Sequence, residues 1–145
     1  MKITNKKAFY DFQILERIEA GINLNGAEVK AVRSGHADLS GSFVRISGAE
    51  AYLVNAKIFP LPYARPEGYD ETRSRKLLLH KSEIIALKGR MDGGGLSLIP
   101  TSIYVIHHLV KVELALGKGK KKFEKKEAKK RADITRDMEE EMGSY

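Results

Sequence analysis

The chain has 145 residues and no cysteine, which excludes disulfide bonds and thiolate metal sites and fits a reducing compartment. Its 42% of hydrophobic residues can form the core of one domain, and a formal net charge of +7 favours a polyanionic partner such as nucleic acid. The sequence contains neither the ~20 apolar residues of a membrane span nor a signal peptide at residues 1–7, so we expect a cytoplasmic protein without a membrane partner.

A period of two in hydrophobicity begins at Tyr10, where even positions are mostly apolar and odd positions mostly polar. The pattern predicts a long, half-buried strand over residues 10–24. Asn25 and Gly26 interrupt it. Apolar residues then recur at helical spacing over residues 27–34, which predicts a short helix with Gly35 as its C-terminal cap.

The middle of the chain predicts a hairpin, a loop and a brief helix. Residues 42–47 and 51–59 are rich in β-branched and aromatic side chains and are joined by Gly48, Ala49 and Glu50, as in a hairpin. Three prolines make residues 60–75 an irregular loop with a basic end. We expect a fully buried strand at residues 77–79, a helix at residues 82–88 capped by Ser82, and a flexible turn at residues 93–95.

Two further strands, at residues 96–107 and 109–116, close the predicted domain. About six short strands with two small helices favour a mainly β, antiparallel barrel, because a parallel sheet needs long helical crossovers. We therefore expect a β-barrel domain at residues 1–116 and a flexible tail at residues 117–145.

The tail differs from the domain in composition. Residues 118–131 hold nine lysines or arginines against Glu124 and Glu127, a net charge of +7, whereas residues 132–145 carry −4 and residues 1–117 carry +4. Ile134, Met138 and Met142 recur every fourth residue, as on one face of a helix. Three apolar side chains bury too little to offset an ordering entropy of about 1–2 kcal/mol per residue, so we expect disorder that folds on a partner.

The sequence contains no pattern typical of catalysis or metal binding. There is no cysteine nucleophile and no G-x-S-x-G, the glycine-rich stretches lack the ending of a phosphate loop, and the four histidines lack metal spacing. His107 and His108 would point to opposite faces of a strand. We expect no catalytic residue, no cofactor and no metal ligand.

Glu28 is the carboxylate of most interest, because it stands between Gly26 and the basic pair Lys30 and Arg33. An acid on a cationic surface repels phosphate unless it accepts hydrogen bonds from base amino groups or positions a neighbouring cation. Both roles remain open from sequence. Cations from distant segments, together with Tyr10, Tyr63 and Tyr69 as stacking candidates, favour a small β-barrel that binds RNA or DNA, although core packing is favoured for Tyr10.

Several segments together resemble one known family. In chain order they are "NKKA" from Asn5, "EAGI" from Glu19, "GAEVKAVRSG" from Gly26, "RKLLLHKSEI" from Arg75, "VKVELALGKGKK" from Val110 and "EKKEAKKR" from Glu124. This set resembles the SsrA-binding protein family, also called small protein B or SmpB, over essentially the whole chain.

The resemblance implies a modified OB-fold-like barrel with added helices, which binds the tRNA-like domain of transfer-messenger RNA and delivers it to stalled ribosomes for trans-translation. It implies a monomer that is no enzyme, with a tail that probes the empty mRNA channel and decoding site of the small subunit. By motif match, the RNA-binding residues are expected to be Asn5, Lys6, Glu28, Lys30, Arg33, Arg75, Lys76 and Lys111. The ribosome-binding tail residues are expected to be Lys120, Lys121, Glu124, Lys125, Lys126 and Arg131.

Two other classes remain open from the residues alone. A different OB-type protein, associated with translation or with single-stranded RNA, would share the fold but prefer unstructured oligonucleotides. A small hydrolase or nuclease would need a pocket with perturbed carboxylates.

Overall fold

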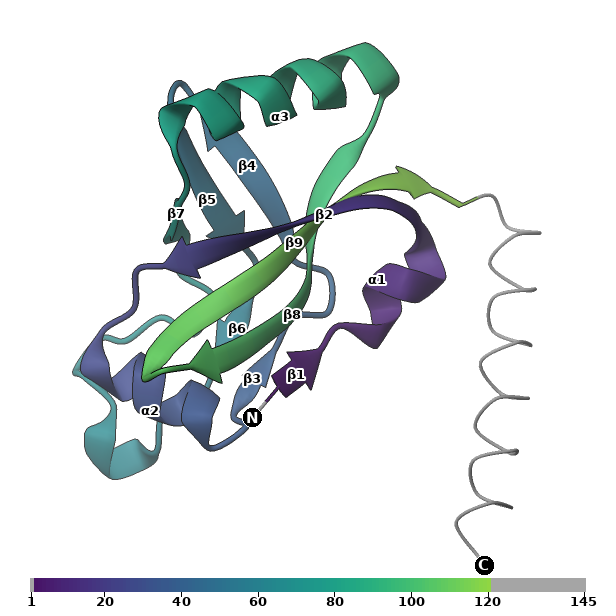
Figure 1. The fold of residues 1–145 in the computed structure, drawn as a ribbon. Helices are drawn as coiled ribbons and strands as arrows, with labels where there is room; N and C mark the ends of the chain where they lie inside the picture. Colours follow the sequence, from purple (N-terminus) through teal and green to yellow (C-terminus); the bar gives the residue numbers. More distant parts are fainter. Residues whose placement is uncertain (1, 121–145) are drawn as a thin grey trace, which may run out of the picture.

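The computed structural model describes residues 2–120, and its main element is a seven-stranded antiparallel sheet flanked by helices (Figure 1). The strands of this sheet are β1 (Lys2–Thr4), β2 (Phe12–Ile22), β4 (Phe43–Ser47), β5 (Glu50–Val54), β7 (Arg75–Leu78), β8 (Ser97–Ile106) and β9 (Leu109–Gly119). Their order is β1-β8-β9-β2-β7-β5-β4. β3 (Ala37–Asp38) and β6 (Lys57–Ile58) form a second, two-stranded sheet. The expected mainly β, antiparallel fold is confirmed.

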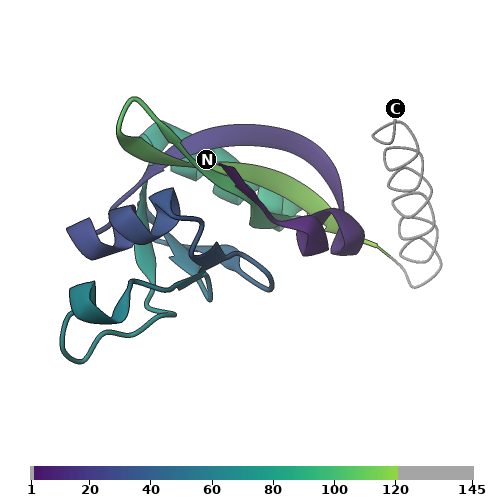
Figure 2. The ribbon, with the colours of Figure 1, turned by 90° about the horizontal axis from the view of Figure 1, so that it is seen from below.

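Three α-helices and one 3-10 turn complete the described chain. They are α1 (Lys6–Asp11), α2 (Gly26–Arg33), α3 (Lys81–Gly94) and η1 (Pro62–Ala64). In both views α2 and the η1 loop lie at one end of the molecule, and α1 lies at the other end, beside the last residues of β9 (Figures 1 and 2). Within residues 2–120, none of the helices combines the length and apolar character needed to cross a bilayer.

The long strands β2, β8 and β9 form the centre of the sheet. β2 pairs with β9 from Phe12 opposite Gly119 to Gly21 opposite Lys111. Alternate side chains face the core, where Leu114 and Val112 are fully buried. The period of two thus identified the buried face correctly, and a β-bulge leaves Leu15 exposed between Ile14 and Glu16.

The predicted start of the first strand at Tyr10 is wrong, because residues 6–11 form α1. Asn5 caps this helix: its side-chain Oδ1 accepts a hydrogen bond from the Ala8 backbone N–H at 3.2 Å. The apolar alternation of β2 continues by chance into the helix. The cap marks the start of α1, and the hydrophobic pattern does not show where α1 ends and β2 begins at Phe12.

The predicted helix after Asn25 is confirmed as α2. Asn25 and Glu28 form a capping box, in which the Asn25 side chain accepts from the Glu28 N–H at 2.8 Å and Glu28 accepts from the Asn25 N–H at 3.1 Å. Gly35 has a φ of +79°, which ends the helix in a conformation that favours glycine. Ala31 and Val32 bury the inner face of α2 in the core.

Two strands of the middle region differ from prediction. The strand expected over residues 51–59 ends at Val54, since Asn55 has a φ of +65°, and Lys57–Ile58 instead pairs with β3. β7 is not fully buried, because Leu77 faces the core while Leu78 is 55% exposed. The irregular loop expected over residues 60–75 is found over residues 60–74, interrupted by η1, because Arg75 already belongs to β7.

The helix predicted at residues 82–88 is longer than expected and does not begin at Ser82. α3 starts after His80, whose backbone N–H donates to the Glu83 carboxylate at 3.0 Å. It runs to Gly94 and ends at Gly95, which has a φ of +61°. The glycines expected as a flexible turn therefore form the last turn of a helix that Ile84 and Leu87 hold on the core.

The closing strand pair is confirmed, with two differences at its ends. β9 continues three residues past the predicted end at Leu116, and the Lys120 N–H then donates to the Asp11 carbonyl at 2.9 Å. His107 and His108, with φ values of +49° and +66°, form the β8–β9 turn and do not lie on opposite faces of a strand. The division into a domain and a tail remains a prediction.

Candidate nucleic-acid interface

A fully buried carboxylate, Glu28, lies beneath the surface formed by α2 and the loop of residues 60–74. Its Oε2 accepts hydrogen bonds from Arg75 Nε at 2.7 Å and from Arg73 Nε at 3.2 Å, and it lies 3.0 Å from the Tyr69 hydroxyl. Its Oε1 accepts from the Asn25 backbone and from the second arm of the Arg73 guanidinium. Glu28 therefore joins the first turn of α2 to the end of the loop.

Arg75 is buried as completely as Glu28, and all five of its N–H groups are used. Besides the bond to Glu28, its Nη1 donates to the carbonyls of Ala56 at 2.8 Å and Arg73 at 3.1 Å. Its Nη2 donates to the Tyr69 hydroxyl at 3.0 Å and the Glu71 carbonyl at 2.9 Å. One side chain thus donates to three backbone carbonyls, of which that of Glu71 also accepts from the Ile58 N–H at 3.2 Å.

These contacts perturb two pKa values. Burial acts to raise the pKa of Glu28, but the hydrogen bonds from Arg73, the Asn25 backbone and Arg75 outweigh it, so the pKa lies below the ordinary value. Burial raises the pKa of the Tyr69 hydroxyl, and the positive charge of Arg75 opposes this effect. Glu28 is an anion and Tyr69 a neutral phenol at neutral pH.

Three residues expected to bind RNA are interior residues. Glu28 and Arg75 are fully buried and committed to each other, and Asn5 is only 3% exposed. The Asn5 side-chain amide donates to the carbonyls of Leu39 at 3.2 Å and Pro100 at 2.8 Å, in addition to capping α1. Their side-chain donors are committed within the protein, which favours a positioning role; direct contact of these three residues with RNA remains a prediction.

The outer surface above this network carries cations beside aromatic rings. Lys30 Nζ lies 5.9 Å from the centroid of Tyr63, whose side chain is 79% exposed. Arg33 Nη2 lies 3.1 Å from His108 Nδ1, so the β8–β9 turn reaches the end of α2. We call Lys30, Arg33, Tyr63 and His108 the α2 face.

The loop adds two partly exposed arginines to the edge of this surface. Arg65 lies 5.9 Å from the Tyr69 ring and forms an ion pair with Glu71 at 3.1 Å. Arg73 is 37% exposed although its guanidinium binds Glu28. The loop therefore presents cations on a backbone fixed from below by Arg75.

Lys76 and Lys111 lie in a different place. Both line an open cavity of about 730 Å³ between β2, β7, β9 and the start of α3. Glu19 and Glu50 line it too, and Lys76 forms an ion pair with Glu50 at 3.4 Å. The charges in this cavity are mixed, so it is a weaker phosphate site than the α2 face.

Lys6 and Lys120 lie at the end of the molecule opposite α2. Lys6 is an exposed residue in the first turn of α1, and Lys120 Nζ donates to the Phe9 carbonyl in the same helix at 2.9 Å. The structure does not bring Lys6 together with Lys30 and Arg33 (Figure 1). The other expected tail residues lie outside the described residues: Lys121, Glu124, Lys125, Lys126 and Arg131.

The sequence did not single out His108 or the pairing of Arg73 with Glu28. His108 enters the α2 face through the β8–β9 turn, which is distant from α2 in sequence. Arg73 and Glu28 are 45 residues apart, and no local pattern reports such a contact. Tyr63 was a stacking candidate, and its exposure agrees with that role.

Comparisons with known proteins agree with the resemblance seen in the sequence. The family described as SmpB protein matches residues 2–144. An SsrA-binding protein of Sulfurihydrogenibium sp. is 51% identical over 136 residues, covering 94% of this chain and 90% of its own. An SsrA-binding protein of Persephonella marina is 47% identical and covers 93% of this chain and 89% of its own.

A solved structure gives the same result for the fold. Its description is "tmRNA-SmpB: a journey to the center of the bacterial ribosome", and its chain superposes with a TM-score of 0.71 at 42% identity. The match covers 90% of this chain and 96% of the other. Family match, sequence identity and fold agree, and the chain therefore belongs to the SmpB family.

Proposed function

We propose that this protein binds the tRNA-like domain of transfer-messenger RNA and delivers it to stalled ribosomes for trans-translation. The observation that carries the proposal is the likeness, along nearly the whole chain, to SsrA-binding proteins and to the chain of a tmRNA–SmpB ribosome structure. The protein acts by binding and positioning RNA, and we assign it no catalytic step and no cofactor. It works as a monomer at the ribosome, and hence in the cytoplasm.

The α2 face is the part of the described surface best suited to folded RNA. Lys30 and Arg33 offer charge to phosphates, and the Tyr63 ring is open to a base. Glu28 and Arg75 act from the interior by holding α2 and the loop in one arrangement. Lys76 and Lys111 extend the contact across the neighbouring cavity, and Asn5 positions α1 beside Lys6.

The tail is proposed to contact the small subunit. Residues 118–131 carry a net charge of +7, which suits a channel lined by phosphates. Lys120 is the first of these contacts and is fixed to α1 through the Phe9 carbonyl. Lys121, Glu124, Lys125, Lys126 and Arg131 follow it into the mRNA channel and decoding site.

A competition experiment tests the proposal with the full chain. Labelled tRNA-like domain of transfer-messenger RNA is bound, then displaced by unlabelled copies of itself, by a tRNA, or by an unstructured oligonucleotide of equal length. We expect the tRNA-like domain to compete best and the oligonucleotide worst. A preference for the unstructured oligonucleotide would favour a single-strand binder and contradict the proposal.

Salt dependence provides a second measurement on the same complex. Each phosphate contact contributes roughly −0.7 to −0.9 to the slope of log K against log salt concentration. We expect a slope equivalent to several contacts. A slope near zero would mean that the cations of the α2 face do not bind phosphate.

A further inference from the structure

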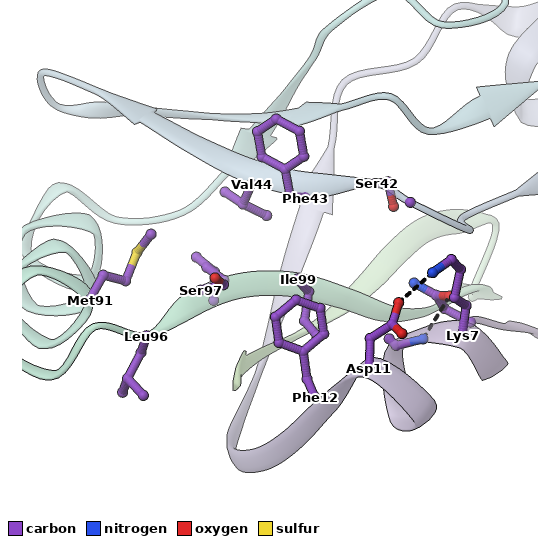
Figure 3. Close-up of a pocket in the computed structure, with 14 residues that line it drawn as sticks. Lys7, Asp11, Phe12, Ser42, Phe43, Val44, Met91, Leu96, Ser97 and Ile99 are labelled. Atoms are coloured by element: carbon purple, nitrogen blue, oxygen red, sulfur yellow. Dashed lines mark hydrogen bonds and ion pairs between the residues drawn. The ribbon is translucent and has the colours of Figure 1, made fainter. Parts of the chain in front are cut away.

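The antiparallel sheet is open along one seam, and a cavity lies in that seam. β4 and β8 lie side by side, yet within residues 2–120 no backbone ladder joins them, since the sheet ends at β4 on one side and at β1 on the other. The cavity has a volume of about 430 Å³. Figure 3 shows its wall of β8 opposite the strand that carries Phe43, with Phe12 on the near side.

The lining of this seam cavity is mainly apolar. Val44 of β4 and Leu98 and Ile99 of β8 are buried residues that line it from opposite sides, and Met91 of α3 lines it as well. Phe43 stands on its rim and is 41% exposed, although it is a large apolar residue on an edge strand. An exposed aromatic ring beside an apolar hollow can gain free energy by covering it with another apolar group.

The chain leaves the described structure at the α1 end of the same cavity. Asp11 and Phe12 line the cavity, Gly119 pairs with Phe12, and the Lys120 N–H donates to the Asp11 carbonyl at 2.9 Å. Lys120 Nζ is held by the Phe9 carbonyl at 2.9 Å. Lys120, the last described residue, is therefore fixed beside Asp11, a residue that lines the seam cavity.

We propose that the seam cavity is an intramolecular binding site for the side chain of Phe123. Phe123 is the one aromatic residue between positions 121 and 144, and it follows Lys120 by three residues, a reach of about 10 Å for an extended chain. Phe12 and Phe43 offer ring edges and faces to a third aromatic ring. The docked ring would anchor the root of the basic tail beside Lys120 and set the direction in which the tail leaves the domain.

Fluorescence of the free, full-length protein tests this site, because the chain has no tryptophan. We expect Phe123→Trp to give emission at shorter wavelength and several-fold weaker quenching by acrylamide than Ala128→Trp, a matched position in the same tail. Introducing Phe43→Lys into both tryptophan variants should abolish the difference in emission and quenching between them, because it places a charge at the cavity. Adding Ile85→Lys, at a 59% exposed apolar residue of α3 outside the cavity, should leave it unchanged.

A cross-linking experiment keeps Phe123 in place and uses the absence of cysteine. Ser97 lines the cavity and pairs with Gly117, so a disulfide between Ser97→Cys and Lys122→Cys requires the tail root to lie along the seam. We expect it to form several-fold faster with Phe123 than with Phe123→Ser in the same double variant. Equal rates, or equal emission of the Phe123→Trp and Ala128→Trp proteins, would overturn the proposal.

Discussion

The Arg75 guanidinium donates its Nε–H to Glu28 Oε2 across 2.7 Å, and both side chains are fully buried. The two residues are 47 positions apart and belong to different elements, Glu28 to α2 and Arg75 to β7. Their contact fixes the helix that carries Lys30 against the loop that carries Tyr63. The geometry of the exposed face therefore depends on a pair that no ligand can reach.

Arg75→Met is expected to lower the free energy of unfolding by about 3–5 kcal/mol, because it breaks a buried ion pair and removes five buried hydrogen bonds, while Arg73 still binds Glu28. Glu28 would lose the Nε–H of Arg75, and the carbonyls of Ala56, Arg73 and Glu71 would each lose one hydrogen bond. Urea unfolding followed by circular dichroism measures the change.

Arg65→Met is the matched control, since it removes a partly exposed arginine from the same loop. The Arg65–Glu71 pair has 39% and 37% of its side chains exposed, and surface pairs contribute ~1 kcal/mol or less. Similar losses for the two variants would contradict the role given to Arg75.

The pH dependence of stability should report the Glu28 carboxylate. Its pKa is lowered in the folded protein, so its stabilising contribution is complete above the ordinary pKa of 4.5 and is lost as the pH falls below 4.5 toward the folded-state pKa. We expect the difference in unfolding free energy between the parent protein and Glu28→Gln to be constant above pH 4.5 and to shrink below it. A difference that grows on acidification would mean that Glu28 is not the charged partner of Arg75.

Elements with local signals were predictable from sequence. The capping box at Asn25 and the glycine after α2 lie within a few residues of the helix they bound, and the helix was placed correctly. The alternation in β9 reflects burial on one face, which a period of two reports directly. The glycines near the end of α3 suggested a turn, but contacts of Ile84 and Leu87 with the core override low helix propensity.

The buried network was not predictable in the same way. Glu28, Tyr69 and Arg75 come together through the fold, and their sequence separations carry no period that predicts contact. Sequence left Glu28 with two roles, accepting bonds from bases or positioning a cation. Its full burial beside Arg73 and Arg75 favours the second.

Tyr63→Ala is expected to weaken binding to the tRNA-like domain without destabilising the fold, since the ring is 79% exposed. Loss of base stacking costs about 1–3 kcal/mol per base, or roughly 5- to 150-fold in Kd. Fluorescence anisotropy at fixed salt measures the change. Ile85→Ala, which removes a 59% exposed apolar side chain from α3 outside both cavities, serves as control and should leave Kd unchanged.

Shortening the chain should separate RNA binding from ribosome rescue, provided that the cut respects β9. A chain ending at Lys120 keeps the pairing of Gly119 with Phe12 and the bond from the Lys120 N–H to Asp11, so we expect unchanged thermal stability and RNA affinity. Rescue of stalled ribosomes in a purified translation system should be lost, because the cationic tail is gone.

A chain ending at Leu116 is the informative contrast. It removes the residues that pair with Ile14, Gln13 and Phe12, together with both hydrogen bonds of Lys120. Each lost hydrogen bond should lower the free energy of unfolding by about 1 kcal/mol. We expect it to unfold at lower temperature than the chain ending at Lys120 and to bind RNA more weakly. Equal thermal stability of the chains ending at Leu116 and at Lys120 would place the end of the folded unit at Leu116. Ribosome rescue by the chain ending at Lys120 would show that the tail is not needed for rescue.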